Sequence, residues 1–185
     1  MNIDFLSAPG HKGLYGPQGS AFVAINSPHT LSTLTEGGNG IYSLTPDMPD
    51  FAPERYEVGT LPLPSIVGLN EGAKFVNNQG IDVINQHEKE LFRLLRDGLL
   101  NIRGATVYAP WREGNTLSFN LASAPPERVC ALLDEQNICV RGGFHCSALG
   151  HTALGTKETG TARASFGIYN TKNDIDRLLS TVSKI

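Results

Sequence analysis

Two stretches in the middle of the chain repeat apolar residues at helical spacing, and each predicts a helix. The first has Pro64 in its opening turn, where proline is tolerated, and ends near Gly80. Its apolar positions are Ile66, Leu69, Ala73 and Val76. The second runs from about Ile81 to about Leu100. Its apolar positions are Val83, Ile84, His87, Leu91, Leu94, Leu95 and Leu99. We expect a domain boundary near this pair of helices.

The residues that follow predict strands and further helices. Thr116–Leu121 alternates polar and apolar residues, which suits a sheet with one buried face. Thr171 and Asp174 have the spacing of a capping box at the start of the last helix. The remaining predicted elements are a helix at 125–136, a short buried strand at 138–141 and a strand at 161–168. This part of the chain is therefore expected to be an α+β domain with helices packed on a small sheet.

The first 60 residues have weaker patterns. Two short apolar runs, at 5–6 and 20–25, predict strands on either side of a glycine-rich loop that contains Lys12. Residues 35–60 have no strong periodicity and are rich in Gly, Pro and Asp, so they predict loops that cross a surface.

Composition narrows the class of protein. Charged residues make up 18 % of the 185 residues, below the usual quarter, which indicates that much surface is buried against something else. The formal net charge of -3 gives no electrostatic footprint for nucleic acid. Three cysteines without a CxxC pair argue against a disulfide framework and favour a reducing, cytoplasmic location. No apolar run has membrane-spanning length, and the first six residues do not have the pattern of a signal peptide.

Lys12 lies between glycines in the segment Gly10-His11-Lys12-Gly13. A lysine amine forms a Schiff base only when part of it is neutral, so such a site must be desolvated or lie near other positive charge. The flanking glycines let a planar ring approach closely, and His11 offers a ring donor to a phosphate. The segment therefore points to pyridoxal phosphate (PLP) as cofactor. The alternative is an exposed lysine in a glycine-rich turn, and the spacing of a Walker phosphate loop is absent.

A second candidate segment places a thiol beside an imidazole, at Cys146 and His145, in a glycine-rich loop after a predicted strand. An exposed cysteine whose thiolate is favoured can act as a nucleophile, whereas the common alternative is a small buried residue. Cys130 and Cys139 fit that buried alternative better, because both lie within predicted core elements.

His145, Cys146 and His151 are also candidates for zinc ligands. Their spacing matches no common zinc pattern, and no fourth ligand is evident. We therefore expect no metal site.

Three further positions are candidates for binding. Arg163 lies in an otherwise small and apolar strand, where a guanidinium is costly unless paired. Its partner is either a substrate carboxylate, held bidentately, or one of the chain's own acids. Thr60 precedes a predicted helix and could bind phosphate or simply belong to the helix entry. Gly38 lies in a close-approach turn or a flexible loop.

The order of these segments resembles the class V aminotransferase family. The motifs are Gly-His-Lys, Gly-Gly, Arg-x-Glu-x-Gly-Thr, Val-Arg-x-Gly-x-His-Cys and Arg-Ala-Ser-Phe-Gly-x-Tyr-Asn-Thr. Within the family the chain looks most like the cysteine desulfurase and selenocysteine lyase group, and the resemblance covers essentially the whole chain. It implies an α/β fold, the fold type I architecture of PLP enzymes, with a large cofactor domain, a small C-terminal domain and a homodimeric active site.

The resemblance also implies a role for each motif residue. Lys12 matches the lysine that carries the cofactor and shuttles protons, and Cys146 matches the cysteine that attacks the substrate sulfur and leaves as a persulfide. Arg163 matches the arginine for the substrate carboxylate, and Arg141 matches the arginine that orders the cysteine loop. The cofactor-binding residues implied are His11, Lys12, Gly38 and Thr60, with Thr60 reaching the cofactor phosphate of the partner subunit.

Two departures from the family pattern limit the resemblance. Pro9 stands where the family usually has Ser or Thr, so one phosphate hydroxyl is missing. The family's partner for the pyridinium nitrogen and its ring-stacking histidine lie upstream of the lysine, where this chain has only about a dozen residues. We therefore expect the C-terminal half of such an enzyme. Residues 1–80 are expected to be a remnant of the large PLP-binding domain, and residues 81–185 the small C-terminal α+β domain.

Three functions stay open at this point. The first is a PLP-dependent cysteine desulfurase that transfers sulfur from L-cysteine to Cys146 and releases alanine. The second is a non-catalytic fragment or subunit module without stable PLP binding, and the third is a related family enzyme for another amino acid. The expected partners are an amino-acid substrate, a second copy or the missing N-terminal half, and a persulfide acceptor protein.

Overall fold

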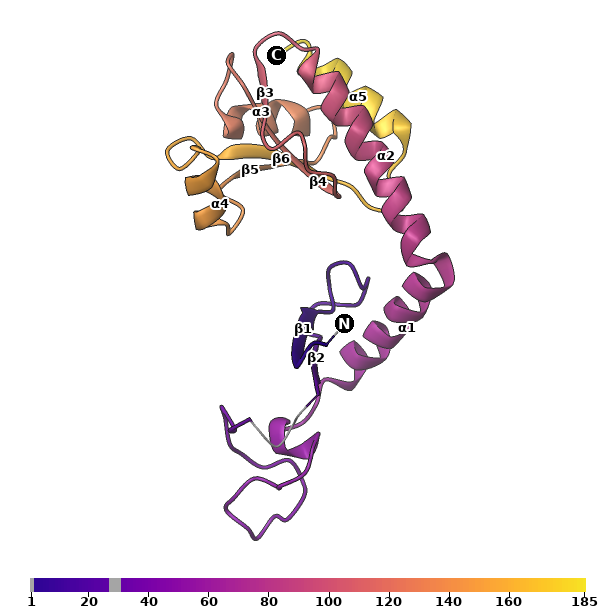
Figure 1. The fold of residues 1–185 in the computed structure, drawn as a ribbon, viewed down its shortest axis with the longest axis vertical. Helices are drawn as coiled ribbons and strands as arrows, with labels where there is room; N and C mark the ends of the chain where they lie inside the picture. The colour runs from indigo at the N-terminus through magenta and orange to yellow at the C-terminus, as the bar shows by residue number, and fades with distance from the viewer. Residues whose placement is uncertain (1, 27–30) are drawn as a thin grey trace. The chain divides into compact units, whose positions relative to one another are not determined.

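The computed structural model describes residues 2–26 and 31–185, which divide into two units with bounds 1–80 and 81–185 (Figure 1). The chain has a mixed α/β fold with one small sheet in each unit. No helix in the described part of the chain is long and apolar enough to cross a membrane.

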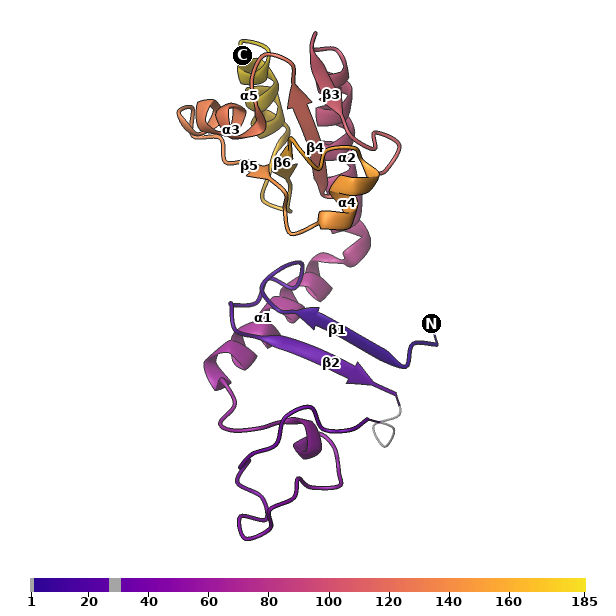
Figure 2. The same ribbon diagram turned by 90° about the vertical axis from the view of Figure 1, so that its left-hand side faces the viewer.

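The first unit contains a two-stranded antiparallel hairpin and one long helix. Strands β1 (Phe5–Pro9) and β2 (Ala21–Ile25) pair so that Pro9 lies opposite Ala21, where the Lys12 loop begins and ends (Figure 2). Helix α1 (Leu63–Gln79) follows a long irregular segment whose regular element is the 3-10 turn η2 (Glu54–Tyr56). The predicted strands, loops and helix of this unit are confirmed, although β1 continues to Pro9, nearer to the loop than the apolar run at 5–6 indicates.

The hairpin keeps much of its apolar surface exposed. Phe5 is 46 % exposed and Val23 is 54 % exposed, and Leu6 and Phe22 are also open. Apolar patches of this kind mark surfaces that pack against other protein.

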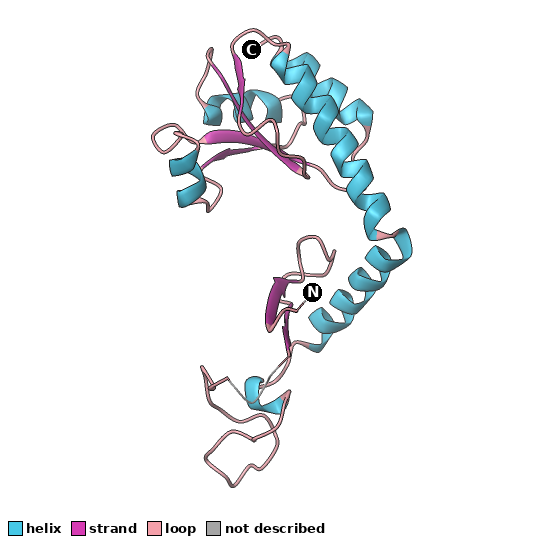
Figure 3. Cartoon of the chain, in the orientation of Figure 1, coloured by secondary structure: helices cyan, strands magenta, loops and turns pink. Residues whose placement is uncertain are grey.

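The second unit is a four-stranded antiparallel sheet covered by helices on one face (Figure 3). The strand order is β3-β4-β6-β5. The strands are β3 (Ala105–Val107), β4 (Thr116–Leu121), β5 (Arg141–Gly143) and β6 (Thr161–Ser165). The helices are α2 (Ile81–Leu100), α3 (Pro126–Asp134), α4 (Ala148–Ala153) and α5 (Lys172–Val182).

The core of this unit lies between one face of the sheet and helices α2, α3 and α5. Alternate residues of β4 and β6 point into it, because successive strand residues face opposite sides. The fully buried side chains include Leu95, Leu99, Phe119, Val129 and Leu133. The opposite face of β4 and β6 is more polar and carries Ser118, Asn120 and Arg163.

Several predicted boundaries in the second unit are wrong. The strand expected at 138–141 is Arg141–Gly143, because Ile138 and Val140 pack against the core outside the sheet ladder. The strand expected at 161–168 ends at Ser165, after which Gly167 and Asn170 form a turn. Strand β3 and helix α4 have only three and six residues and gave no recognisable periodicity.

The predicted capping box at the start of α5 is confirmed, and its contribution can be measured. The Asp174 carboxylate accepts a hydrogen bond from the Thr171 backbone N–H at 2.8 Å. This bond is the main cause that lowers the pKa of Asp174 below its ordinary value. A carboxyl group whose pKa is lower in the folded state stabilises that state at pH values above its pKa in the unfolded chain, about 3.9. This stabilisation is lost as the pH falls through the pKa of the folded state.

We therefore expect Asp174→Ala to lower the free energy of unfolding by about 1 kcal/mol at pH 7. The difference from wild type should shrink below about pH 3.9, as measured by urea unfolding at both pH values. Asp176→Ala, on the same helix and exposed, is the matched control. An equal difference at both pH values would contradict the assignment.

Candidate active site

The Lys12 loop is a defined turn between β1 and β2. The Gly10 N–H donates to the Ser20 carbonyl at 2.8 Å, and the Gly16 N–H donates to the Gly10 carbonyl at 2.8 Å. The Tyr15 N–H donates to the Lys12 carbonyl at 3.0 Å. Lys12 is exposed, and its amine has no ion pair or side-chain hydrogen bond within residues 2–26 and 31–185. The fold therefore presents this amine on a hydrogen-bonded loop and leaves it free to react.

This loop contacts α1 through main-chain atoms at positions that lack side chains. A methyl group at Gly72 would collide with the Leu14 carbonyl oxygen and lie 2.8 Å from the Tyr15 carbonyl carbon. On the loop side, a methyl group at Gly16 would lie 3.0 Å from the Leu69 Cα. Because both partners are glycines, the loop and the helix approach more closely than side chains would allow.

The segment before α1 brings two other predicted residues together. The Gly59 N–H donates to the Gly38 carbonyl at 2.9 Å, so Gly38 lies beside the Gly59–Thr60 peptide. Gly59 has φ 78°, a conformation that favours glycine. Gly38 and Thr60 are both exposed. The structure thus places these two candidate phosphate contacts next to each other within the first unit.

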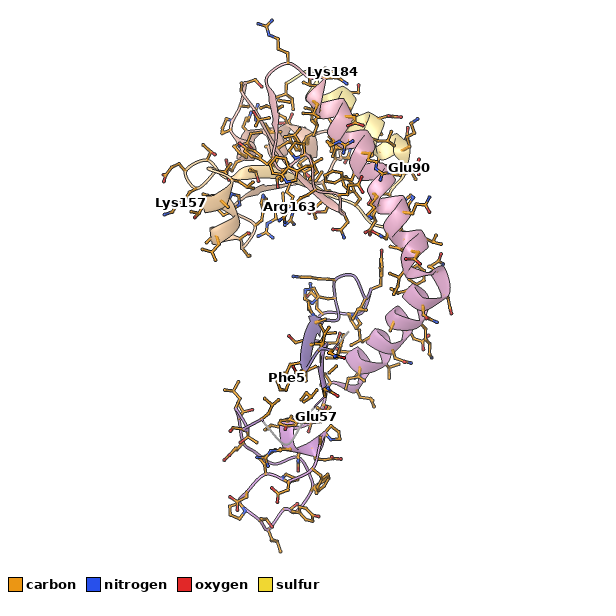
Figure 4. All side chains as sticks on the ribbon, viewed as in Figure 1. Phe5, Glu57, Glu90, Lys157, Arg163 and Lys184 are labelled. Atoms are coloured by element: carbon orange, nitrogen blue, oxygen red, sulfur yellow. The ribbon has the colours of Figure 1, made fainter. Side chains whose placement is uncertain are left out.

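In the second unit, two arginines stand directly opposite each other. Arg141 on β5 is the register partner of Arg163 on β6, so both side chains leave the same face of the sheet. This is the face opposite the helix-covered core, as the position of Arg163 in Figure 4 illustrates. Like charges in this arrangement repel each other and destabilise the sheet.

The Arg141–Arg163 pair has no counterion of its own. Neither guanidinium forms an ion pair with Asp or Glu in the described part of the chain, and Arg163 Nε is buried without a hydrogen-bond partner there. An unpaired buried donor beside a second cation is a strong site for an anion such as a carboxylate.

Cys146 follows β5 on an exposed loop. His145 and Cys146 both have positive φ, 53° and 57°, which is uncommon for residues other than glycine. The Ser147 N–H donates to the Phe144 carbonyl at 3.0 Å and closes this turn. The fold thus holds Cys146 in a strained, solvent-accessible turn. Backbone strain of this kind is often found at functional sites.

The other cysteines differ in exposure. Cys139 is exposed, so its predicted burial is wrong, although its neighbours Ile138 and Val140 pack against the core. Cys130 on α3 is partly buried, and this burial raises the pKa of its thiol, with a smaller contribution from Glu127. Cys146 and Cys139 are therefore the two readily accessible thiols.

His145 and His151 support the Cys146 loop. His145 Nε2 lies 3.0 Å from the Thr161 carbonyl oxygen and 3.1 Å from its hydroxyl. His151 is only 4 % exposed, and its Nδ1 lies 2.7 Å from the Thr156 hydroxyl. The two rings pack with centroids 5.7 Å apart. Thr156 and Thr161 carried no signal in the sequence, because their role depends on this packing.

The zinc alternative has no support from the geometry. Within residues 2–26 and 31–185, no group of three or more His, Cys, Asp or Glu side chains is arranged to hold a metal ion. His145 and His151 instead direct ring nitrogens to threonine oxygens.

The comparison with protein families decides the class. The profile of the aminotransferase class-V family matches residues 1–178. The chain belongs to this family. Class-V relatives include a probable cysteine desulfurase of Staphylococcus epidermidis, 34 % identical over 191 residues, and one of Methanothermobacter thermautotrophicus, 35 % identical over 195 residues. Both alignments cover the whole of this chain. They cover only 45 % of the first relative and 48 % of the second, so this chain spans about half of their length.

Solved structures show the same partial match. The apo cysteine desulfurase of Thermococcus onnurineus NA1 superposes with a TM-score of 0.86 and 29 % identity, covering 98 % of this chain and 46 % of that one. The Escherichia coli cysteine desulfurase CsdA in its S-sulfonic acid form superposes with a TM-score of 0.85 and 28 % identity. That match covers 99 % of this chain and 46 % of the CsdA chain. This chain therefore has the fold of the C-terminal part of a fold type I enzyme, as its sequence predicts.

Proposed function

We propose that this chain is part of a PLP-dependent cysteine desulfurase, in which residues 1–80 belong to the cofactor domain and residues 81–185 form the small domain. One observation supports this most strongly: the exposed Cys146 lies on the loop after β5, whose Arg141 faces Arg163, and neither arginine has an acidic partner among the described residues. A reactive thiol and a carboxylate site on adjoining residues match the chemistry of an amino acid that gives up sulfur. The relatives named cysteine desulfurase support the same activity.

The residues of the first unit fit PLP in part. The Lys12 amine is free for attachment, and a side chain at Gly13 would meet no atom within 4 Å, so a planar ring has room beside the loop. His11 and Gly38 are exposed and would contact the cofactor, and the exposed Thr60 would reach the cofactor phosphate of a partner subunit. When bound, PLP withdraws electrons from the amino-acid substrate and so makes its α-hydrogen acidic. The remaining cofactor contacts of the family come from protein outside this chain.

Substrate binding falls to the arginine pair. The guanidinium of Arg163 would hold the α-carboxylate of L-cysteine bidentately, and Arg141 would add a second positive charge. The bound carboxylate would also relieve the repulsion between the two arginines. In the same enzyme the Lys12 amine would take the α-proton of the substrate as a general base.

Cys146 would perform the sulfur transfer. Its thiolate attacks the substrate sulfur, forming an S–S bond while the substrate C–S bond breaks. The electron pair of that bond stays on the β-carbon, which gains a proton, so alanine leaves and Cys146 keeps the extra sulfur as a persulfide. A persulfide acceptor protein would then remove this sulfur. We place the enzyme in the cytoplasm, because its three free cysteines persist as thiols in a reducing environment.

A non-catalytic module is the second candidate. The exposed apolar surface of β1 and β2 favours a chain that works only against other protein, either a second copy or the rest of the cofactor domain. A class-V enzyme for another amino acid is distinguished from a desulfurase by its independence of Cys146.

Cofactor attachment is the first test. The purified chain is mixed with PLP, its near-visible absorption is recorded, and borohydride reduction followed by peptide mapping locates the cofactor. We expect the label on Lys12 alone and its loss in Lys12→Ala, while Lys74→Ala, also exposed and in the same unit, keeps it. A label spread over many lysines would show that this chain does not hold PLP by itself and would favour the non-catalytic module.

A further inference from the structure

Cys146 lies on an excursion of the chain, residues 144–160, between two neighbouring strands. The excursion leaves β5 at Gly143 and returns to β6 at Thr161, and these two residues are register partners. A methyl group at Gly160 would lie 3.0 Å from the Gly143 Cα, so the two ends of the excursion are in backbone contact. The sheet therefore fixes where the excursion begins and ends, and other contacts must fix the turn that carries the thiol.

One side chain of this turn reaches back to the sheet. His145 directly precedes Cys146, and its Nε2 lies 3.0 Å from the Thr161 carbonyl oxygen and 3.1 Å from the Thr161 hydroxyl. A carbonyl oxygen only accepts hydrogen bonds, so Nε2 carries the hydrogen and donates it to Thr161. Thr161 is 0 % exposed, so water does not compete for this bond at its acceptor. The residue next to the thiol is thus bonded to β6.

The backbone of the turn depends on such a bond. His145 and Cys146 both have positive φ, 53° and 57°, and residues other than glycine keep this conformation only where the surrounding structure holds them. The His151 ring packs beside the His145 ring, with centroids 5.7 Å apart. His151 is itself buried, and its Nδ1 lies 2.7 Å from the Thr156 hydroxyl. Loss of the His145 ring would therefore release the turn.

The His145–Thr161 bond is made on the face of the sheet that carries the arginine pair. Thr161 and Arg163 are two residues apart on β6, so their side chains leave the same face. Burial is the main cause that lowers the pKa of His145, and the hydrogen bond to Thr161 opposes it. The neighbouring charges of Arg163, His151 and Arg141 lower this pKa further. The imidazole therefore lies within electrostatic reach of both guanidinium groups.

We propose that His145 is a positioning residue that, through its bond to Thr161, holds the Cys146 thiol at a set distance from the arginine pair. This inference rests on the proposed function and deepens it. In L-cysteine the carboxylate and the sulfur are joined by a short, fixed chain of bonds. A carboxylate bound by the arginines therefore brings that sulfur to the thiol only if the turn and β6 keep one spacing, and a small misplacement lowers the rate steeply.

The test compares two alkylating reagents on the chain without cofactor or substrate, at one fixed pH. Iodoacetate carries a carboxylate, and iodoacetamide is its neutral counterpart. Both react with the same thiolate, so the ratio of their rates cancels the exposure of the thiol and the fraction that is ionised. The ratio instead reports how strongly nearby positive charge attracts the carboxylate. Mass spectrometry of the Cys146 peptide gives both rates.

The reference is the same thiol in the chain unfolded by urea, where the sheet no longer holds the turn beside the arginines. We expect the iodoacetate-to-iodoacetamide ratio at Cys146 to be about tenfold higher in the folded chain than in the unfolded one. Arg163→Ala should remove most of this difference, because the attraction comes from the arginine pair.

Three substitutions at His145 separate its bond to Thr161 from the general packing of the turn. Glutamine places an amide N–H where Nε2 stands, so His145→Gln can still donate to Thr161. His145→Asn carries the same amide on a shorter side chain that does not reach Thr161, and His145→Ala carries none. We expect His145→Gln to keep the wild-type ratio, whereas His145→Asn and His145→Ala bring it down to the value of the unfolded chain.

A ratio at Cys146 that is the same in all three variants would overturn the proposal, since the bond to Thr161 would then not set the position of the thiol. A wild-type ratio that does not fall on unfolding would also overturn it, and that measurement needs no variant. Slow alkylation of the partly buried Cys130 shows that each variant has kept its fold.

Neither reagent requires PLP or L-cysteine, so the two proposals fail separately. Failed cofactor attachment at Lys12 would count against the proposed function and leave the measured position of Cys146 unchanged. Equal ratios in the His145 variants would overturn the positioning role and leave cofactor attachment untouched.

Discussion

Cys146→Ala is expected to stop sulfur transfer, lowering alanine release from L-cysteine at least about a thousandfold in any preparation that shows turnover. The reason is that no other residue can accept the sulfur from the same position. The measurement pairs alanine release with mass spectrometry of the Cys146 peptide, which should carry one added sulfur atom in the wild type.

The matched control is Cys139→Ala. Cys139 is also exposed and lies in the same unit, yet it precedes β5 rather than following it. Its loss should leave alanine release and the persulfide unchanged. Undiminished alanine release in Cys146→Ala would exclude the desulfurase mechanism, and transamination that continued without Cys146 would indicate the related aminotransferase activity instead.

Phe119→Ala is expected to cause the largest loss of stability, about 3–5 kcal/mol. Phe119 is 0 % exposed and lies on β4 between Val107 of β3 and Ala162 of β6. Removing its ring leaves a cavity that neighbouring strands cannot close. Because whole domains are stable by only about 5–15 kcal/mol, this change should markedly lower the urea midpoint followed by circular dichroism.

Trp111→Ala provides the comparison. Trp111 is an aromatic residue of the same unit but is 78 % exposed, so its removal should change the free energy of unfolding by no more than about 0.5 kcal/mol. Equal effects of the two substitutions would mean that the core does not lie between β4 and the helices.

The long amphipathic helices were predictable because their pattern reflects burial directly. Leu91, Leu95 and Leu99 repeat at helical spacing, and all three are buried on α2. Val83, included in the same predicted stripe, is 60 % exposed, and the buried residues of α2 begin only at Leu91. Short elements such as β3 form by pairing with another strand, here β4. Three residues are too few to show the alternating pattern from which a strand is predicted.

For the candidate site, the sequence proposes residues but does not indicate how they are arranged. The order of motifs identified Lys12, Cys146 and Arg163 as candidates, yet nothing in the sequence indicated that Arg141 would be the register partner of Arg163. Register is set by the assembled sheet, because a shift of one residue reverses every side chain. For the same reason, the contact of His145 with Thr161 required the fold.

The glycine contact between the Lys12 loop and α1 has a consequence for engineering. A lysine whose loop rested on side chains could be moved by repacking those side chains with residues of other sizes. Here the loop and the helix backbone meet in van der Waals contact at Gly72 and Gly16, where no side chain acts as a spacer. Redesign that moves this amine away from its present position would therefore have to move the backbone of α1 at Gly72.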